Sequence, residues 1–406
     1  MAHPRSNHHL EKTRSERLGK CKLCGSFDIE LLAALPDMPV DIGVLYDSAS
    51  QAAQAPRREI LFEYCKSCGL AQNGAAETAF LFKPGYEVSL HHSPIYEAFL
   101  NNLARELADR YSLRGKDVVE IACGNGHFLR KICEAADCRG IGVDPCVTLA
   151  LQSASKDAPI RLISEFYAEK HRDLPCDFVV SRHMLHEHSH PSNFLKTLRD
   201  TLGDRQVPVY FEVVNARRTA ELSVVWQILF EYRSYFTSRT LSLLLASCGF
   251  RVLRVGPTYE DGQYLAIEAI PDPTWDPSQQ ISASPDPAEY ALFRHFASAI
   301  MDKVTKWHEI LTARQAAGQK VAIWGTAGRG ITFLNLVEAA RMIPFVVDIN
   351  PDRQGKFIPG SAQEILAPVD LQRVRPDCLI LTNATYRAEI EHQVRSLGLG
   401  CEILVA

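Results

Sequence analysis

The sequence has little net charge and lacks any long apolar run. Among its 406 residues, 44 Lys and Arg stand against 48 Asp and Glu, which leaves a net charge of −4. So small a charge disfavours a nucleic-acid or anionic-membrane surface as the partner. No apolar stretch reaches the about 18 residues of a membrane-spanning helix, and the first 20 residues are polar, without a secretory signal. We expect a cytoplasmic protein that binds a small molecule, as a monomer or a small homo-oligomer.

The composition is that of an ordinary folded protein, with 46% hydrophobic and 23% charged residues. At about 150 residues per domain, the length predicts two or three domains. Five prolines between Pro271 and Pro287 exclude a helix interior and a central strand there. We predict a flexible tail at 1–18, a zinc-binding domain at 19–80, a methyltransferase domain at 81–270, a linker at 271–287 and a Rossmann-like domain at 288–406.

Short apolar runs alternate with helical patterns in two regions, which predicts an α/β fold with two doubly wound parallel sheets. Between the regions, apolar residues recur at helical spacing from Tyr290 to Leu311, after a proline that is acceptable at a helix start. The expected strands of the first region are 117–121, 140–143, 177–180, 207–214, 250–255 and 264–267, and those of the second are 321–324, 345–347, 378–381 and 402–405.

Four of the 12 cysteines form two matched Cys-x-x-Cys-Gly units, Cys21 with Cys24 and Cys65 with Cys68. Four thiolates suit tetrahedral zinc, and a shell of four protein ligands leaves no open position for catalysis. We therefore predict a structural zinc ion; an iron–sulfur or redox site and four reduced buried thiols are the alternatives. The other eight cysteines show no pairing pattern.

A glycine-rich loop follows the strand expected at 117–121, in the sequence Glu-Ile-Ala-Cys-Gly-Asn-Gly, and an acid, Asp144, ends the next strand. Glycines let a ligand approach the backbone, and an acid at that position accepts hydrogen bonds from ribose hydroxyls. The loop lacks the third glycine of the dinucleotide fingerprint, which favours S-adenosylmethionine over NAD. The expected cofactor-binding residues are Glu120, Ala122, Gly124, Asn125, Gly126, Asp144, Pro145 and His183.

The two cysteine units, the glycine loop and several later motifs together resemble the three-domain sugar C-methyltransferases. The later motifs are Phe211-Glu-Val, Glu231-x-x-Ser-Tyr-Phe, Val321-Ala-Ile-Trp-Gly, Val347-Asp-x-Asn-Pro and Gln354-Gly-Lys-Phe-Ile-Pro-Gly. The resemblance covers the chain from about residue 20 to its end. It implies a zinc domain, a central S-adenosylmethionine domain, a C-terminal Rossmann-like domain, and methylation of a nucleotide-linked 4-keto-deoxysugar beside its ketone.

The resemblance also implies the residues that move protons. Tyr86 matches a family tyrosine and Glu231 matches the Glu of a Glu-His pair, whose His is Tyr232 here, while a further family His falls on Glu187. A tyrosine, with an ordinary pKa of about 10, is a poorer base at neutral pH than a histidine at about 6.5. We expect proton transfer to be shared among Tyr86, Glu231 and an imidazole, with Tyr232 positioning the acceptor. The candidate imidazoles are His186 and His188, in a loop that also contains His183 and His190.

Two other features have open interpretations. The histidine loop follows the strand at 177–180, where open α/β sheets bind ligands, but such loops are often only solvated, and a second metal site there has no further support. The second glycine run, Gly325-Thr-Ala-Gly-Arg-Gly, follows a strand and resembles a dinucleotide loop with altered spacing. It predicts either a wall of the substrate cleft, with Arg329 or Asn350 touching the substrate, or an architectural remnant.

Three functions compete at this point. The first is methylation of a nucleotide sugar, and the second is methylation of oxygen, nitrogen or carbon in another small metabolite, which the loss of the family's His favours. The third is a binding module without catalysis, against which two ligand loops and a cluster of His, Tyr and Glu argue.

Overall fold

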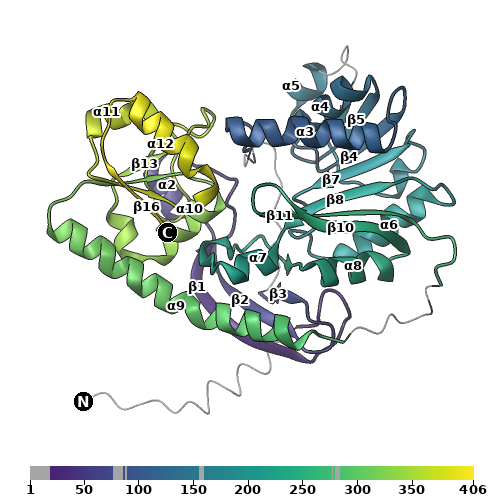
Figure 1. The fold of residues 1–406 in the computed structure, drawn as a ribbon, viewed down its shortest axis with the longest axis horizontal. Helices are drawn as coiled ribbons and strands as arrows, with labels where there is room; N and C mark the ends of the chain where they lie inside the picture. The colour runs from purple at the N-terminus through teal and green to yellow at the C-terminus, as the bar shows by residue number, and fades with distance from the viewer. Residues whose placement is uncertain (1–18, 76–85, 87–88, 155–159, 277, 279–283) are drawn as a thin grey trace.

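The structure is a computed structural model that describes residues 19–75, 86, 89–154, 160–276, 278 and 284–406. The described residues form three β-sheets, two of them covered by helices (Figure 1). Among them, no helix is both long and apolar enough to cross a membrane. The predicted tail at 1–18 lies outside the described residues.

The central sheet has seven strands in the order β10-β11-β8-β7-β4-β5-β6. The strands β4 to β8 pair in parallel, while β11 pairs antiparallel with both β8 and β10. The strand order reverses between β4 and β7, so the loops after these two strands lie where open α/β sheets bind ligands. The strands are β4 (Asp117–Ile121), β5 (Arg139–Val143), β6 (Ile160–Ile163), β7 (Phe178–Arg182), β8 (Val209–Val214), β10 (Phe250–Thr258) and β11 (Tyr264–Pro271).

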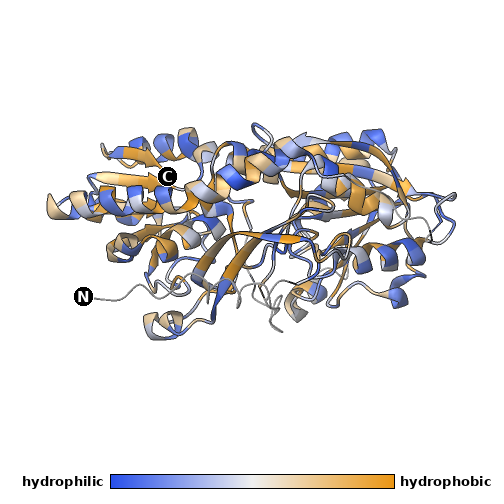
Figure 2. Ribbon diagram, turned by 90° about the horizontal axis from the view of Figure 1, so that it is seen from below, coloured by the Kyte–Doolittle hydropathy of each residue, from blue (hydrophilic) through white to orange (hydrophobic). Residues whose placement is uncertain are grey.

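Helices pack on the central sheet with their apolar sides inward. In α4, for example, Phe128, Leu129 and Ile132 are buried. Figure 2 shows the same division across the molecule, with largely apolar strands and helices that carry both polar and apolar residues. The helices of this part are α3 (Pro94–Arg110), α4 (His127–Ala136), α5 (Leu149–Ala154), α6 (Pro191–Leu202), α7 (Ala216–Glu221) and α8 (Ser238–Ser247).

The C-terminal sheet has five parallel strands in the order β14-β13-β12-β15-β16. Its order reverses between β12 and β15, which places a second binding-type edge after these strands. The elements are β12 (Val321–Trp324), β13 (Phe345–Val347), β14 (Ile365–Leu366), β15 (Cys378–Leu381) and β16 (Glu402–Val405), with helices α10 (Gly328–Leu336), α11 (Leu371–Val374) and α12 (Arg387–Ser396).

A four-stranded antiparallel sheet joins the N-terminal segment to the rest of the chain. It consists of β1 (Ile29–Pro39), β2 (Arg57–Cys65), β3 (Ala71–Asn73) and β9 (Ser234–Tyr235), with helix α2 (Ala49–Ala53) after β1. Because β9 comes from the central part of the sequence, this sheet includes residues from both sides of the boundary that we draw at residue 80. The domain boundaries therefore stay a prediction.

The long helix α9 (Pro287–Ala316) crosses beneath the molecule and connects its parts (Figure 1). It begins as expected from the sequence, because Pro287 occupies its first turn and the Asp286 side chain accepts a hydrogen bond from the Ala288 N–H. Its Phe293 and Phe296 pack edge-on against Phe62 of β2. The aromatic stripe thus serves core packing.

The structure confirms the α/β fold class and corrects three details of the sequence prediction. The last two strands of the central sheet are antiparallel, because a tight turn at 259–262 joins β10 directly to β11 and leaves no room for a crossover helix. Two edge strands, β6 and β14, were not predicted, because an exposed arginine interrupts the four residues of β6 and β14 has only two residues.

Candidate active site

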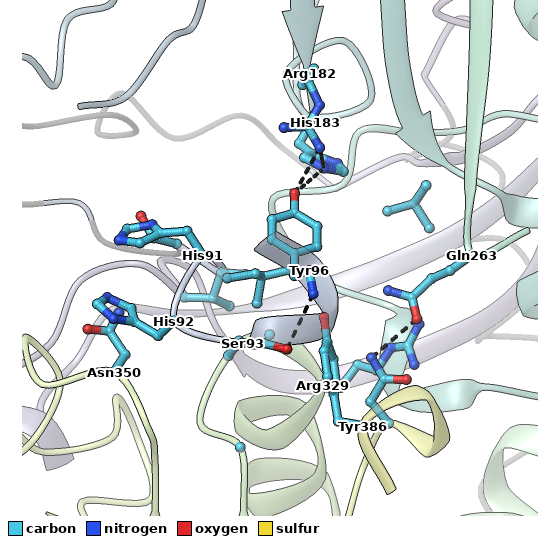
Figure 3. A pocket seen from close by; sticks show the side chains of 18 of the residues that line it. His91, His92, Ser93, Tyr96, Arg182, His183, Gln263, Arg329, Asn350 and Tyr386 are labelled. Carbon is cyan, nitrogen blue, oxygen red and sulfur yellow. Dashed lines mark hydrogen bonds between the residues drawn. The ribbon is translucent and has the colours of Figure 1, made fainter. Parts of the chain in front are cut away.

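A cavity of about 380 Å³ lies where the carboxyl ends of the central and the C-terminal sheets face each other. Residues after β4 and β7 form one side, and residues after β12, β13 and β15 form the other. The loop before α3, with His91 and His92 in Figure 3, and the segment 227–232 complete the wall. Both sheets therefore contribute the edge at which open α/β sheets bind ligands.

The glycine loop after β4 borders this cavity. Gly124 has a φ of +55° and Gly126 of +75°, in the left-handed region that favours glycine. A Cβ on Gly124 would meet no atom within 4 Å, so the space beside it is open. The expected cofactor residues that line the cavity are Glu120, Ala122, Gly124, Asn125 and His183.

Asp144 lies beside the glycine loop and holds it. Its Oδ2 accepts a hydrogen bond of 2.8 Å from the Gly124 N–H, and its Oδ1 accepts one of 2.6 Å from the Cys146 N–H. Asp144, Pro145 and Gly126 are not among the described residues that line the cavity. The structure thus places these three expected cofactor residues adjacent to the cavity rather than in its wall.

A buried ion pair supports the wall behind the loop. Arg182 donates to the Tyr96 hydroxyl at 2.9 Å (Figure 3). It also donates to Glu212 at 2.6 Å, and His183 Nε2 lies 3.2 Å from the same Glu212 carboxylate. Burial, the largest single cause, would raise the pKa of Glu212, but the charge of Arg182 together with the hydrogen bonds from His183 and Arg182 outweighs it and holds this pKa at about 2. Burial lowers the pKa of His183, so its imidazole is neutral at pH 7.

Glu120 differs from Glu212 although both are buried. Burial raises the pKa of Glu120 to about 8, against the opposing charge of Arg182. Its Oε2 has no hydrogen-bond partner among the described residues, although it is fully buried. A buried polar atom at a cavity wall without a partner is typical of a ligand-binding position.

Tyr86 and Glu231 form a hydrogen-bonded pair. The Tyr86 hydroxyl donates to Glu231 Oε2 at 2.7 Å, and the Ile42 N–H donates to Oε1 at 2.9 Å. Tyr86 can lie this close because Gly43 has no side chain, and a Cβ there would come within 2.5 Å of the tyrosine ring. Neither Tyr86 nor Glu231 is among the described residues that line the cavity, whereas Ile42 is.

Glu187, His186 and Tyr232 do line the cavity. The His186 and Tyr232 rings pack edge to face with centroids 4.5 Å apart, and His186 Nε2 lies 3.9 Å from Glu187. Burial lowers the pKa of His186 and raises that of Tyr232, and burial together with the charge of Glu231 raises the pKa of Glu187. Burial also raises the pKa of Glu231, to about 8.

The structure gives His188 a different position from the one we expected. Its Nδ1 accepts a hydrogen bond of 3.0 Å from the His190 N–H, and its ring packs against Phe194 of α6. His188 is not among the described residues that line the cavity. The chain turns after Glu187, so neighbouring side chains of the loop reach different surroundings.

The C-terminal side of the cavity contains Arg329 and Asn350, as the cleft-wall interpretation predicts (Figure 3). Asp348 stands where a dinucleotide-binding unit would have its ribose-binding acid, and its carboxylate contacts protein groups. Its carboxylate accepts hydrogen bonds from the Thr326 N–H and hydroxyl and lies 3.7 Å from the buried guanidinium of Arg353. Asp348 also lines the cavity, so these contacts hold its carboxylate at the cleft wall, much as Asp144 is held against the first glycine loop.

Several residues of the cavity were not among our expected site residues. Glu187 appeared only as the position of a missing histidine, and Gln227, Tyr96, Tyr264 and Tyr386 were not considered. Tyr96 is on α3, Gln227 precedes the Glu231 motif by four residues, and Tyr386 comes from a turn after β15. None of them belongs to a motif of fixed spacing, so only the fold brings them together.

The four cysteines of the N-terminal units meet as the sequence predicts. Their sulfur atoms all lie within 4.8 Å of one another, with Cys21 and Cys68 3.5 Å apart and Cys24 and Cys65 3.6 Å apart. A tetrahedron of sulfur atoms at about 2.3 Å from zinc has edges of about 3.8 Å. The cluster is therefore compatible with a zinc ion, and it is separate from the residues that line the cavity.

Comparisons with known proteins agree with this arrangement. Residues 95–255 match a model described as a methyltransferase domain, and residues 283–405 match one described as a C-methyltransferase C-terminal domain. No curated protein matches the chain.

Solved structures are similar to parts of the chain at low identity. The magnesium protoporphyrin IX methyltransferase of Synechocystis PCC 6803 with bound SAM is 17% identical, with 44% of this chain and 80% of that chain covered and a TM-score of 0.33. A 1,6-didemethyltoxoflavin-N1-methyltransferase of Burkholderia thailandensis is 14% identical, with 50% and 96% covered and a TM-score of 0.35.

The two family models together match most of the chain, and they divide it in the same way as the two α/β sheets. The second of them supports a C-methyltransferase family. Together with the glycine loop, they identify the chain as an S-adenosylmethionine-dependent methyltransferase.

Proposed function

We propose that the chain methylates the carbon beside the ketone of a nucleotide-linked 4-keto-deoxysugar. The observation that carries this proposal is a single cavity that reaches from the glycine loop at Gly124 to Tyr232 and Glu187. A hydrogen beside a ketone is a weak acid, so its removal needs a positioned base and a group that stabilises the enolate oxygen. The match to a C-methyltransferase model supports carbon as the methylated atom.

The residues around the glycine loop fit the cofactor. Gly124 leaves open space beside the backbone, and the buried Glu120 Oε2 lacks a protein partner among the described residues. Glu120, Ala122, Gly124, Asn125 and His183 would hold the cofactor, with Gly126 and Pro145 shaping the loop and Asp144 accepting from ribose hydroxyls. When bound, S-adenosylmethionine supplies an electrophilic methyl group.

The carboxylates of Glu187 and Glu231 are the proposed proton acceptors. Burial raises the pKa of both carboxyl groups, the charge of Glu231 raises that of Glu187 further, and Glu187 lines the cavity. Because the charge of Glu231 opposes the ionisation of Glu187, the two carboxyl groups do not readily ionise together, and the ionised member of the pair takes up the proton from the substrate carbon. Tyr86 holds Glu231 in place, and His186 packs against Tyr232. His188 leaves the proposed set because of its position.

The four-cysteine cluster is the proposed zinc site. Cys21, Cys24, Cys65 and Cys68 supply four sulfur ligands at spacings near those of a tetrahedron. The cluster lies at the turns that flank β1 and β2 and outside the residues that line the cavity, which supports a structural role. Zinc there would join the start of the described chain to the β2–β3 connection.

The runner-up is a methyltransferase of another small metabolite. It is favoured by Tyr232, which stands where the family's base would be a histidine. An acceptor that is itself a nucleophile needs no base beside the ketone, so the carboxylates would then have a binding role.

The test uses the full-length protein, S-adenosylmethionine and a TDP-linked 4-keto-2,6-dideoxyhexose. We expect a product heavier by one methylene whose NMR spectrum places the new methyl beside C4. Tyr86→Phe, His186→Asn and Glu187→Gln should each lower turnover by about 10² or more while the affinity for S-adenosylmethionine, measured by calorimetry, is retained. Methylation of an oxygen or nitrogen, or normal rates in all three variants, would favour the runner-up.

A further inference from the structure

A chain of three side chains crosses the cavity wall from the C-terminal to the central part. Arg329, in the first turn of α10, donates from Nε to Gln227 Oε1, and Gln227 Nε2 donates to the hydroxyl of Tyr232 at 3.0 Å. All three residues line the cavity. Tyr232 is the residue that stands where the resemblance would place a histidine.

The direction of these hydrogen bonds follows from chemistry. A guanidinium has five N–H donors and no acceptor, so Gln227 must turn its oxygen to Arg329. The amide nitrogen, which only donates, then faces Tyr232. The oxygen of Tyr232 is therefore an acceptor in this contact, and the phenolic proton must point elsewhere.

Nothing within the described chain takes that proton, because no described residue accepts a hydrogen bond from Tyr232. Tyr86 has the opposite arrangement, since its hydroxyl donates to a carboxylate, Glu231, at 2.7 Å. The two tyrosines of the site thus have opposite hydrogen-bond polarity. One has its proton committed to a carboxylate, and the other has a proton available for a ligand in the cavity.

Arg329 strengthens this polarity. It forms no ion pair with a carboxylate among the described residues, so its charge is not cancelled by a protein anion. A cation at the end of a hydrogen-bonded chain polarises each member, which makes the Tyr232 hydroxyl a stronger donor. That is the requirement for a group that faces an oxygen as it becomes negative.

We infer that Gln227 and Arg329 are positioning residues that fix Tyr232 as the hydrogen-bond donor to the acceptor's carbonyl oxygen. The inference rests on the proposed function. When the C–H bond beside the ketone breaks, its proton goes to the Glu187–Glu231 pair, its electron pair forms the C=C bond, and the C=O π pair moves to the oxygen. Tyr232 keeps its own proton and donates a hydrogen bond to that oxygen.

Gln227→Glu tests the polarity with little change in shape. A carboxylate at this position would pair with Arg329, which favours folding, and it would accept the Tyr232 proton instead of donating to its oxygen. We expect kcat to fall by about 10², as when one oxyanion donor is lost, with an unchanged affinity for S-adenosylmethionine. Gln263→Glu adds the same charge to the same cavity outside the chain of three, so its smaller loss would exclude a general effect of charge.

A double-mutant cycle separates positioning from a structural role. If Gln227 acts through Tyr232, Gln227→Glu should add little to the loss in Tyr232→Phe, because the hydroxyl is already absent. Arg329→Lys, which keeps a donor-only cation, should retain a rate within about 10-fold of the wild type. Additive losses in the cycle would overturn the inference.

A neutron structure of the deuterated protein gives a readout that needs no acceptor. We expect the deuterium of Tyr232 to point into the cavity and the ND₂ group of Gln227 to face the tyrosine oxygen. A deuterium placed between Tyr232 and Gln227 Oε1 would refute the inference whatever the substrate. If instead wild-type protein neither methylates the keto sugar nor exchanges its C–H hydrogen in D₂O, the proposed function fails and the neutron result still decides the polarity.

Discussion

Glu231→Gln should stabilise the protein at alkaline pH and abolish its activity. Burial raises the pKa of this carboxyl from 4.5 to about 8. The folded state therefore binds a proton that the unfolded chain releases between these values, so the stability it contributes is complete below about pH 4.5 and lost as the pH rises through about 8. At about 1.4 kcal/mol for each pKa unit, ionising Glu231 in place costs about 5 kcal/mol.

The substitution also has a cost, which the hydrogen bonds define. Glu231 accepts from Tyr86 and from the Ile42 N–H through its two oxygens, whereas an amide has only one oxygen. One donor loses its partner, at a cost of about 1–3 kcal/mol. We therefore expect the variant to be less stable than the wild type by about 1–3 kcal/mol at pH 5, and more stable by about 2–4 kcal/mol at pH 9.

Urea unfolding followed by tryptophan fluorescence from pH 5 to pH 9 measures this crossover. Glu59→Gln, at an exposed position of β2, is the matched control and should follow the wild type at every pH. Methyl transfer should be lost at all pH values in Glu231→Gln. If the two unfolding curves differ by the same amount at pH 5 and pH 9, Glu231 does not titrate in this range and the proposed base pair is wrong.

Other outcomes test the cofactor loop, the cysteine cluster and the buried ion pair. Asp144→Ala and Gly124→Val should each weaken S-adenosylmethionine binding in calorimetry, the first by removing a ribose acceptor and a hydrogen bond to the loop, the second by filling open space at a φ of +55°. Metal analysis should give about one zinc per chain, and Cys24→Ser should lower thermal stability more than turnover; an iron chromophore would contradict zinc. Glu212→Gln should cost about 3–5 kcal/mol in urea unfolding, because it leaves the Arg182 charge buried without its partner; a loss below about 1 kcal/mol would show that this charge is solvated.

Patterns of fixed spacing predicted much of the fold and part of the site. The glycine loop, the acid at the end of β5 and the two cysteine pairs each lie within a short segment, so their geometry is set locally. The two cysteine pairs are more than 40 residues apart, and the pairing of β1 with β2 brings their sulfur atoms within 4.8 Å of one another. The strands of the two α/β sheets were recognisable where apolar residues follow one another, as in β4 and β12. In β6 an arginine interrupts the four residues, and β14 has only two residues, so neither leaves a clear pattern.

The wall of the cavity could not be predicted in this way. Gln227, Arg329 and Tyr232 come from two different α/β parts, and their contacts depend on how the C-terminal sheet sits against the central one. The histidine loop was difficult for another reason, because the sequence does not show which of its side chains reach the cavity. His186 and His188 look equivalent in the sequence, but a turn places one in the cavity wall and the other against Phe194.

The choice of proton acceptor shows why ordinary pKa values mislead in this cavity. In water a tyrosine is a poor base and a histidine a good one, which is the comparison that the sequence allows. Burial disfavours the charged form of every group, so it moves the pKa of Tyr86 further above 10 and that of His186 further below 6.5, both away from neutral pH. The same effect moves the pKa of Glu187 and Glu231 upward, toward neutral pH. Burial thus favours carboxyl groups as the bases of this cavity, and the glutamate at the position of the family's histidine is consistent with that requirement.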